Sequence, residues 1–387
     1  MKASETLMNS ANRRLGECKT PGGKLAAAEI ELDGGFIVQA RIHGDFFIHP
    51  EPEAEHILTT LAASLVGAPE NLDPAAIAAR LRAALPFGVE LLGTSPDAIA
   101  EAVRRAMTTS NREVAPLERI GAFTEYEIAN WTHRWTTLNW RLIPETPLPP
   151  AMNVALDEVL TNRVAAGQCP PTLRFWKWSA PAVIVGRCQS IRNEVDLDAA
   201  TAKGIQIVRR MTGGGAMFLQ PHGAITYSLY IPETSLTGLS IRQSYEVCDS
   251  WVIQCLREIG VDAHHVPIND IACGAGKIGG AAQARRSGVV LHHTTLAYDM
   301  DPGEMVSVLR IGREKLSDKA VASASKRVSP LISQTGLPRD EIVKRLFNHF
   351  QNRFGGTLST LSDVEMNTAA ELMTNKYTDN EWLKAFE

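Results

Sequence analysis

The sequence predicts an α+β protein in which a small N-terminal ββααα unit precedes a larger domain with a mixed, largely antiparallel sheet and surrounding helices. Three observations lead to this prediction. The chain has 387 residues, enough for two or three domains that each bury a core. Two strand-like segments precede three helical ones in the first 110 residues. From residue 139 onward strands and helices are mixed without regular βαβ winding.

Residues 1–110 are expected to form an accessory or docking domain, because they hold no cluster of titratable residues suited to catalysis. Asp33-Gly34-Gly35 has the composition of a turn between two alternating segments. Asp73-Pro74 and Ser95-Pro96 each combine a capping side chain with proline at the first helical position. The expected strands are 24–32 and 36–42, and the expected helices are 53–66 and the segments that begin at 74 and 96.

Residues 111–138 show no sustained periodicity and are expected to form a linker, in which Trp131 and Trp135 pack on one of the domains. Residues 139–387 are expected to form the larger domain. Its predicted helices are 150–166, 196–203, 244–259, 302–310, 339–353 and 362–375. Its predicted strands are 172–178, 182–186, 205–210, 216–220, 224–231 and 288–299.

Composition excludes several classes of protein. Lys and Arg total 39 against 43 Asp and Glu, and this net charge of −4 argues against a general nucleic-acid binder. No run of about 18 apolar residues could span a membrane, and the N-terminus lacks the apolar core of a signal peptide. The six cysteines lie far apart, without a C-x-x-C pair, so we expect reduced thiols in a cytoplasmic protein.

The most distinctive stretch, from Val208 to Phe218, contains two arginines and then three consecutive glycines. Glycines between two strands let the backbone approach a ligand and turn several N–H groups toward it. Arg209 and Arg210 would add fork-shaped donors for phosphate or carboxylate. Together these features predict an anion-binding loop. The alternative interpretation is a mobile hairpin loop with a solvated arginine pair.

A second stretch, residues 269–283, places Lys277 among small residues, where its ammonium group could reach a phosphate or a developing negative charge. The stretch is not a P-loop, because Ile271 and Ile278 occupy the positions that require Gly and Ser or Thr. Gly274-x-Gly276-x-x-Gly279 matches the dinucleotide fingerprint, yet no apolar strand precedes it, so we do not favour a Rossmann site.

The pairs His264-His265 and His292-His293 are not expected to bind metal. Neighbours on a strand point to opposite faces, so neither pair can chelate one ion, and an indirect or structural role is favoured. Cys273 is expected to be a small buried thiol.

With both stretches in place, residues 139–332 resemble the catalytic domain of lipoate-protein ligases, within the wider biotin/lipoate ligase fold. The resemblance rests on 152–158, 173–176, 183–187, 193–196, the Arg-Arg-x-Thr-Gly-Gly-Gly-Ala loop at 209–216, 225–228, 269–270, 277–283 and 291–293. Residues 20–110 are similar to the accessory domain of the family, chiefly through Gly23-Lys24-Leu25, 35–37 and 42–47. In the family that domain usually follows the catalytic domain or is a separate chain, whereas here it comes first.

The resemblance implies ATP-dependent attachment of lipoate to a lysine of an acceptor protein, with ATP and Mg²⁺ as cofactors and lipoyl-AMP as the intermediate. It makes Lys277 the catalytic residue, which bridges the lipoyl carbonyl and the phosphate, and Asp270 the candidate Mg²⁺ ligand. The substrate- and nucleotide-binding residues that it implies are Arg209, Arg210, Gly213, Gly214, Gly215, Ala216, Met217, Phe218, Asn269, Asp270 and Lys277.

The expected partner is a lipoyl-acceptor protein: a lipoyl domain, a glycine-cleavage H-like protein or a lipoate-binding protein. No nucleic acid or membrane partner is expected, and we expect a monomer. The accessory domain is expected to close over the adenylation site and exclude water.

Two positions depart from the family pattern. Leu219-Gln220 stands where His-Asp is usual, and Thr294 stands where Gly commonly follows the paired histidines, which leaves the pocket shape open. One alternative is octanoyl transfer from an acyl carrier protein, which uses the same fold and a cysteine thioester. That cysteine lies beyond the lysine motif, and this chain has no cysteine after Cys273. The other alternative is a non-catalytic protein that binds lipoyl carriers.

Overall fold

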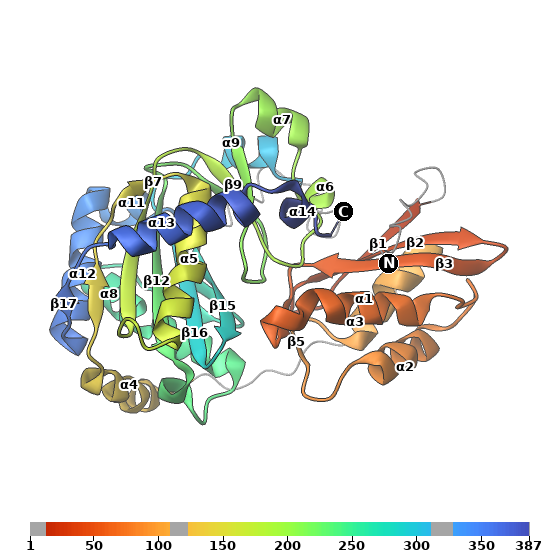
Figure 1. Cartoon of the computed structure of the whole chain (residues 1–387), viewed down its shortest axis with the longest axis horizontal. Coiled ribbons are helices and arrows are strands. Elements are labelled where there is room, and N and C mark those ends of the chain that lie inside the picture. The colour runs from red at the N-terminus through yellow and green to blue at the C-terminus, as the bar shows by residue number, and fades with distance from the viewer. Residues whose placement is uncertain (1–12, 109–122, 311–327, 387) are drawn as a thin grey trace.

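The computed structural model describes residues 13–108, 123–310 and 328–386. Figure 1 shows two bodies: an N-terminal one built from the first strands and helices, and a larger one in which helices surround a sheet. The large sheet is mixed and mostly antiparallel, and a small sheet domain precedes it. The predicted α+β class is therefore confirmed.

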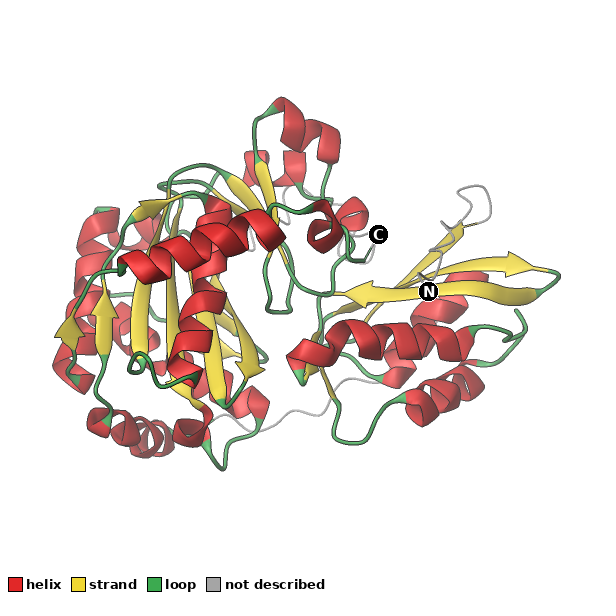
Figure 2. Ribbon diagram, in the orientation of Figure 1, coloured by secondary structure: helices red, strands yellow, loops and turns green. Residues whose placement is uncertain are grey.

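The N-terminal body is a three-stranded antiparallel sheet with helices on one face (Figure 2). Its strands are β1 (Arg13–Lys19), β2 (Leu25–Asp33) and β3 (Phe36–Gly44), and its helices are α1 (Ala54–Leu65), α2 (Pro74–Ala84) and α3 (Pro96–Met107). Asp73 and Ser95 cap α2 and α3 as predicted. A short ladder joins β4 (Phe47–His49) to β5 (Glu90–Leu92). The sequence analysis missed β1, because its four charged residues obscure the alternation.

The larger body is built on a nine-stranded sheet in the order β13-β14-β15-β16-β12-β8-β6-β17, with β7 also paired to β8. These strands are β6 (Arg141–Ile143), β7 (Pro147–Leu148), β8 (Thr172–Trp178), β12 (Ala224–Pro232), β13 (His264–Val266), β14 (Asp270–Cys273), β15 (Gly276–Arg286), β16 (Val289–Ala297) and β17 (Thr357–Leu358). Helices α5 (Pro150–Ala165), α8 (Ile241–Glu258), α11 (Leu331–Thr335), α12 (Arg339–Phe354) and α13 (Asp363–Leu372) pack around it. A π-helical turn (Met373–Tyr377) follows α13.

A second, three-stranded sheet carries the arginine–glycine stretch. It consists of β9 (Ala182–Val185), with β10 (Gln206–Arg209) parallel to it on one side and β11 (Met217–Leu219) antiparallel on the other. The short helices α6 (Ile191–Glu194), α7 (Leu197–Ala202), α9 (Pro302–Val308) and α14 (Asn380–Leu383) lie around it. The loop between β10 and β11 therefore starts and ends beside the same central strand.

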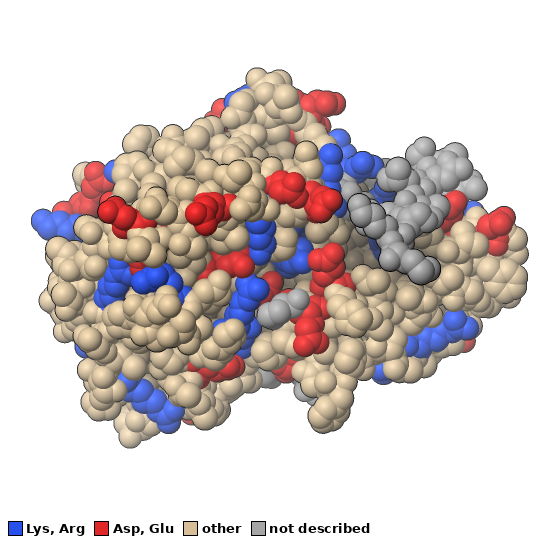
Figure 3. Space-filling model, viewed as in Figure 1, with Lys and Arg blue, Asp and Glu red and all other residues tan. Residues whose placement is uncertain are grey.

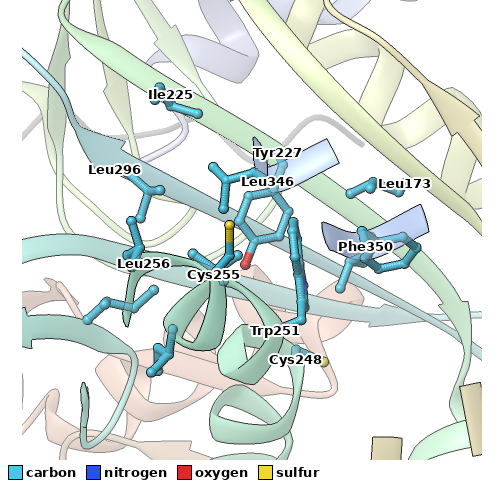
Figure 4. Packing of buried hydrophobic residues seen from close by; sticks show 14 of the residues in the cluster. Leu173, Ile225, Tyr227, Cys248, Trp251, Cys255, Leu256, Leu296, Leu346 and Phe350 are labelled. Carbon is cyan, nitrogen blue, oxygen red and sulfur yellow. The ribbon is translucent and has the colours of Figure 1, made fainter. Parts of the chain in front are cut away.

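The core of the larger body lies between α8, α12 and one face of the main sheet (Figure 4). Trp251 of α8 meets the Phe350 ring of α12 edge-on at 5.1 Å and the Tyr227 ring of β12 at 4.9 Å. These aromatic contacts belong to one large cluster of buried side chains on this side of the sheet. The opposite side, which α5 partly covers, remains available for the site.

The predicted linker is not wholly irregular. Helix α4 (Glu125–His133) begins with a capping box between Thr124 and Glu127, and a 3₁₀ turn (Arg134–Thr137) follows it. Trp135 is fully buried against Trp140 and Phe354, as expected from its size and position. Residues 109–122 lie outside the described residues.

The segment 264–280, to which no element was assigned from sequence, forms β13, β14 and the start of β15. A register irregularity between Ile271 and Ala272 breaks the alternation that would have identified β14 as a strand. In the described part of the chain, no helix has both the length and the apolar character that a bilayer crossing requires.

Candidate active site

A cavity of about 510 Å³ lies where the two bodies meet, and both contribute to its wall. The larger body supplies the glycine loop and the lysine stretch, and the N-terminal body supplies Lys24 and Asp45. Charged side chains of both signs gather along the boundary between the bodies (Figure 3). Five cationic and three carboxylate side chains line the cavity: Lys19, Lys24, Arg210, Lys277 and Arg310 against Asp45, Glu194 and Asp270. This excess of positive charge suits an anionic ligand.

Arg210 holds the glycine loop from within. Its guanidinium donates to the carbonyl oxygens of Gly213 at 2.6 Å and Gly215 at 3.0 Å, and to Ile184 O at 3.2 Å. Burial lowers the pKa of Arg210 to about 10, so the group stays charged at neutral pH. A fixed cation therefore lies directly beneath the loop.

These contacts decide where the loop N–H groups point. In a planar trans peptide the N–H lies opposite the preceding carbonyl. Because the carbonyls of Gly213 and Gly215 point at Arg210, the N–H groups of Gly214 and Ala216 point away from it. Neither N–H donates to any described residue, and both residues line the cavity. The loop thus offers backbone donors to an anion, as the sequence predicted.

A buried chain of hydrogen bonds orients Arg210. Asp157 of α5 bonds His293 Nδ1 at 2.7 Å, His293 Nε2 bonds Thr212 Oγ1 at 2.8 Å, and Arg210 Nε donates to Thr212 Oγ1 at 2.9 Å. Because the carboxylate accepts from Nδ1, Nε2 carries the lone pair and accepts from the threonine hydroxyl. Burial lowers the pKa of His293, despite the Asp157 carboxylate that raises it, which favours this neutral ring. The donors and acceptors of this chain are therefore fixed: His293 Nδ1 donates to Asp157, and the Thr212 hydroxyl donates to His293 Nε2.

Lys277 lies across the cavity on β15. Its Nζ donates to Asp270 Oδ1 at 2.8 Å, and nearly half of its side chain is exposed. Lys24 of the N-terminal body approaches the same oxygen at 4.0 Å. Burial alone would raise the pKa of Asp270, but the two ammonium groups outweigh it and hold that pKa below its usual range. An ionised carboxylate thus lies between two cations from different domains.

Arg209 takes no part in the cavity wall. It is fully buried and donates to five backbone carbonyls. Those carbonyls belong to Gly186, Arg187, Gln189, Trp382 and Leu383. This position does not support its predicted role in nucleotide binding, because Nε and Nη2 donate to carbonyls of α14, whereas Nη1 donates to carbonyls of the segment that follows β9.

The glycine loop also accommodates the N-terminal body. A Cβ atom on Gly213 would lie 2.8 Å from the Phe47 ring, and one on Gly214 would lie 3.1 Å from it. Phe47 in turn packs on Tyr245 of α8, with ring centroids 5.7 Å apart. The absence of side chains at Gly213 and Gly214 therefore allows close domain contact, a second function for these glycines that the sequence did not suggest.

Of the predicted site residues, the structure brings eight to the cavity wall: Arg210, Gly214, Gly215, Ala216, Met217, Asn269, Asp270 and Lys277. Arg209, Gly213 and Phe218 are not among the wall residues, and Phe218 is buried in the core beside β9. Sequence reasoning missed Lys24 and Asp45 as site residues. Gly22-Gly23-Lys24 does repeat the pattern of a lysine after small residues that identified Lys277, and that signal could have found it.

The two departures from the family pattern lie outside the wall. Leu219 is buried in an apolar cluster, and Gln220 donates to Glu304 of α9 at 2.5 Å. Thr294 donates to Asp249 on the core side of β16. The paired histidines are separated as predicted, since His292 also bonds Asp249 whereas His293 faces the cavity.

All six cysteines lie in described parts of the chain, and none is among the residues that line the cavity. Cys273 is buried, as expected. Burial raises the pKa of Cys188, which lies at the domain boundary, to about 12. A thiol in that state is a poor nucleophile.

Comparison with known proteins agrees with this geometry. Residues 149–351 match the family model described as the lipoyl protein ligase A/B catalytic domain. The octanoyltransferase LipM of Kyrpidia tusciae is 30% identical over 271 residues, which cover 63% of this chain and 97% of that protein.

Among solved structures, a bi-partite lipoate protein ligase, studied with its E2 lipoyl domain from Thermoplasma acidophilum, is similar with a TM-score of 0.57 and 30% identity. The match covers 64% of this chain and 97% of that one. A lipoate-protein ligase A bound with ATP is similar with a TM-score of 0.56 and 28% identity, over 64% of this chain and all of that one.

Proposed function

The chain belongs to the lipoyl protein ligase A/B family, and we propose that it attaches lipoate to a lysine of an acceptor protein through an ATP-dependent lipoyl-AMP intermediate. It is an enzyme of the group that contains lipoate ligases and octanoyltransferases. One observation carries the choice of the ligase: the cavity gathers Arg210, loop N–H groups and Lys277, but no thiol.

In the first step, the lipoate carboxylate attacks the α-phosphorus of ATP and pyrophosphate leaves. Negative charge grows on the phosphate oxygens and on the leaving group. The N–H groups of Gly214 and Ala216, with Arg210 behind them, provide preorganised positive charge for the phosphates. Lys277, opposite the loop, would contact the carboxylate and the α-phosphate together.

In the second step, the acceptor lysine attacks the carbonyl of lipoyl-AMP and AMP leaves. The developing oxyanion needs a cation that is already in place. The Lys277 ammonium group is partly exposed, and among the described residues it donates to Asp270 alone, so it can turn from the carboxylate to the substrate. This mobility suits a residue that serves both steps.

The residues present fit a Mg²⁺ ion carried by ATP. Asp270 is ionised, and the buried Asn269 Oδ1 has no hydrogen-bond partner among the described residues although Asn269 lines the cavity. Carboxylate and amide oxygens are ligands that this hard cation accepts. Such an ion would offset charge on the phosphates.

Octanoyl transfer is the second candidate, and the curated relative named above supports it. That reaction needs a thiolate at the acyl site to form a thioester. Cys273, the cysteine nearest to Lys277 in sequence, is buried on β14 and does not line the cavity. This position favours the ligase over the transferase.

A non-catalytic carrier-binding role is the third candidate. It rested on Leu219-Gln220, and both residues lie outside the cavity wall. Their replacement of the usual His-Asp therefore leaves the cations of the site intact. The acceptor is expected to be a small protein with an exposed lysine, such as a lipoyl domain.

The proposal is tested by offering a lipoyl domain two acyl donors in parallel. The first is lipoate with ATP and Mg²⁺, and the second is octanoyl acyl carrier protein without ATP. Mass spectrometry of the lipoyl domain measures the product. The ligase predicts modification only with the first donor. Modification only with the second would establish octanoyl transfer, and modification with neither would favour carrier binding.

A further inference from the structure

Lys24 differs from an ordinary surface lysine in its surroundings. Only 20% of its side chain is exposed, and the ion pair that it forms within the described residues, with Asp270 of the other domain, is long at 4.0 Å. Its ammonium group donates no hydrogen bond to any described residue. Burial lowers the pKa of Lys24, although Asp270 acts in the opposite direction. A largely buried ammonium group that donates no hydrogen bond is costly unless a ligand supplies acceptors.

The position of Lys24 is fixed by its own domain. Its backbone N–H donates to Gly93 O at 2.6 Å, and a Cβ on Gly93 would lie 2.5 Å from Lys24 Cγ. The aliphatic part of Lys24 therefore passes through space that only glycine leaves open, close to Ile268 of the larger body. This path directs the ammonium group to the cavity wall.

The N-terminal domain is also held in register with the larger one. Asp45 N donates to Leu25 O at 2.9 Å, next to Lys24, and Gln189 Nε2 donates to Asp45 Oδ1 at 2.9 Å. Gln189 Oε1 in turn accepts from Gly186 N at 2.8 Å, at the end of β9. A short path of hydrogen bonds thus links Leu25, the neighbour of Lys24, to the end of β9, the strand that lies between β10 and β11.

We propose that Lys24 is a phosphate-binding residue of the adenylation step, supplied to the site by the N-terminal domain. This inference rests on the proposed ligase function. In that step a bond forms between the lipoate carboxylate oxygen and the α-phosphorus. The bond from that phosphorus to the bridging oxygen breaks, and pyrophosphate leaves with the electron pair. Lys24 binds the departing pyrophosphate, while Lys277, on the other side of Asp270, stays with the α-phosphate.

Because Lys24 and Lys277 bind different phosphates, they should contribute differently to adenylation and to acyl transfer. Pyrophosphate has left before the acceptor lysine attacks, so Lys24 has no charge to neutralise in the transfer step. Replacing Lys24 should therefore slow formation of lipoyl-AMP and leave its use unchanged. A purely structural Lys24, which only docks the domains, would affect both steps or neither.

The test uses the full-length chain with Lys24→Ala and with Lys24→Met, which keeps the aliphatic packing if the alanine variant folds poorly. Arg82→Ala is the matched control, because it removes an exposed cation of the same domain, paired only with the exposed Asp97. Three quantities are measured: lipoate-dependent ATP–pyrophosphate exchange, transfer from preformed lipoyl-AMP to a lipoyl domain, and binding of inorganic pyrophosphate by calorimetry.

We expect Lys24→Met to slow exchange about 100-fold and to weaken pyrophosphate binding about tenfold, with transfer unchanged. Exchange as fast as in Arg82→Ala would overturn the role of Lys24, as would an equal loss in both steps. If the unmodified chain shows no lipoate-dependent exchange, the proposed function fails and this inference fails with it. The two failures are thus distinguished by the unmodified chain.

Discussion

The chain contains two pairs of identical neighbours, Arg209-Arg210 and His292-His293, and in each pair one residue lies on the cavity side and the other is packed in the interior. Arg210 and His293 belong to the cavity side, where one hydrogen-bonded chain joins them through Thr212. Arg209 donates its hydrogen bonds to backbone carbonyls, and His292 bonds Asp249 in the core. Both histidines have the same kind of carboxylate partner, yet only one is linked to the wall of the cavity.

The difference shows that local chemistry alone does not assign a residue to a site. Adjacent residues on a strand project to opposite faces, which separates His292 from His293 on β16, whereas Arg209 ends β10 and Arg210 begins the loop that follows. Residues of the N-terminal domain complete the wall of the cavity, whereas α8 and α12 pack on the other face of the main sheet. The predictions below test this division.

The largest effect is expected for Lys277→Ala. In the proposed function Lys277 contacts the reacting groups, so loss of this cation should slow lipoyl-AMP formation by about 10²–10³-fold. Its side chain is 46% exposed, so the melting temperature should not change. Adenylation is measured by pyrophosphate exchange, with Lys344→Ala, an exposed lysine of α12, as the control. Retention of more than half the original rate would remove Lys277 from the mechanism.

The paired variants His293→Gln and His292→Gln should separate the two faces. Each breaks a buried network, so each should cost about 1–3 kcal/mol of stability. Only His293→Gln releases Thr212 and thereby Arg210, so only this variant should slow adenylation, by about tenfold per folded molecule. Stability comes from denaturant titration and the rate from exchange. Equal rates for the two variants would show that the chain through His293 does not position Arg210.

Arg209→Met should lower the stability of the protein and leave the rate of adenylation nearly unchanged. The variant leaves several buried carbonyls without donors and should lose about 3 kcal/mol or more of stability. Below its melting temperature, however, adenylation should be nearly normal, because Arg209 does not line the cavity. A stable Arg209→Met with a large rate defect would instead support nucleotide binding by this arginine.

The smallest effect is expected at the domain boundary, where Glu51 follows β4. Burial raises the pKa of Glu51 to about 7, against the opposing effect of Arg187 and Arg286. In the unfolded chain this carboxyl ionises near its ordinary pKa of 4.5, so folding stability falls as the pH rises from 4.5 to 7. Glu51→Gln removes this fall in folding stability, because glutamine does not ionise.

We expect Glu51→Gln to raise the melting temperature by about 1–3 °C at pH 8 and not at pH 4.5. Its exposed neighbour provides the control, because Glu53→Gln should have little effect at either pH. A gain at pH 4.5 that equals the gain at pH 8 would contradict the raised pKa.

Much of this arrangement could be predicted from sequence. Alternation and capping identified β2, β3 and the three helices of the N-terminal body but not β1, β4 or β5, and the glycine and lysine stretches both line the cavity. Alternation also predicted that His292 and His293 would separate. Sequence could not place Arg209, because its acceptors on α14 lie more than 170 residues away in the chain. Lys24 lines the cavity because of how the two domains dock, which the sequence does not show, although Gly22-Gly23-Lys24 repeats the pattern that identified Lys277.

The central claim is that the chain activates lipoate itself before any acceptor is present. The most direct test incubates the unmodified chain with ATP, Mg²⁺ and labelled pyrophosphate, with and without lipoate, and without a lipoyl domain. We expect label in ATP only when lipoate is added, because adenylation is reversible and needs no acceptor. No label in ATP, together with octanoylation of a lipoyl domain from octanoyl acyl carrier protein, would contradict it.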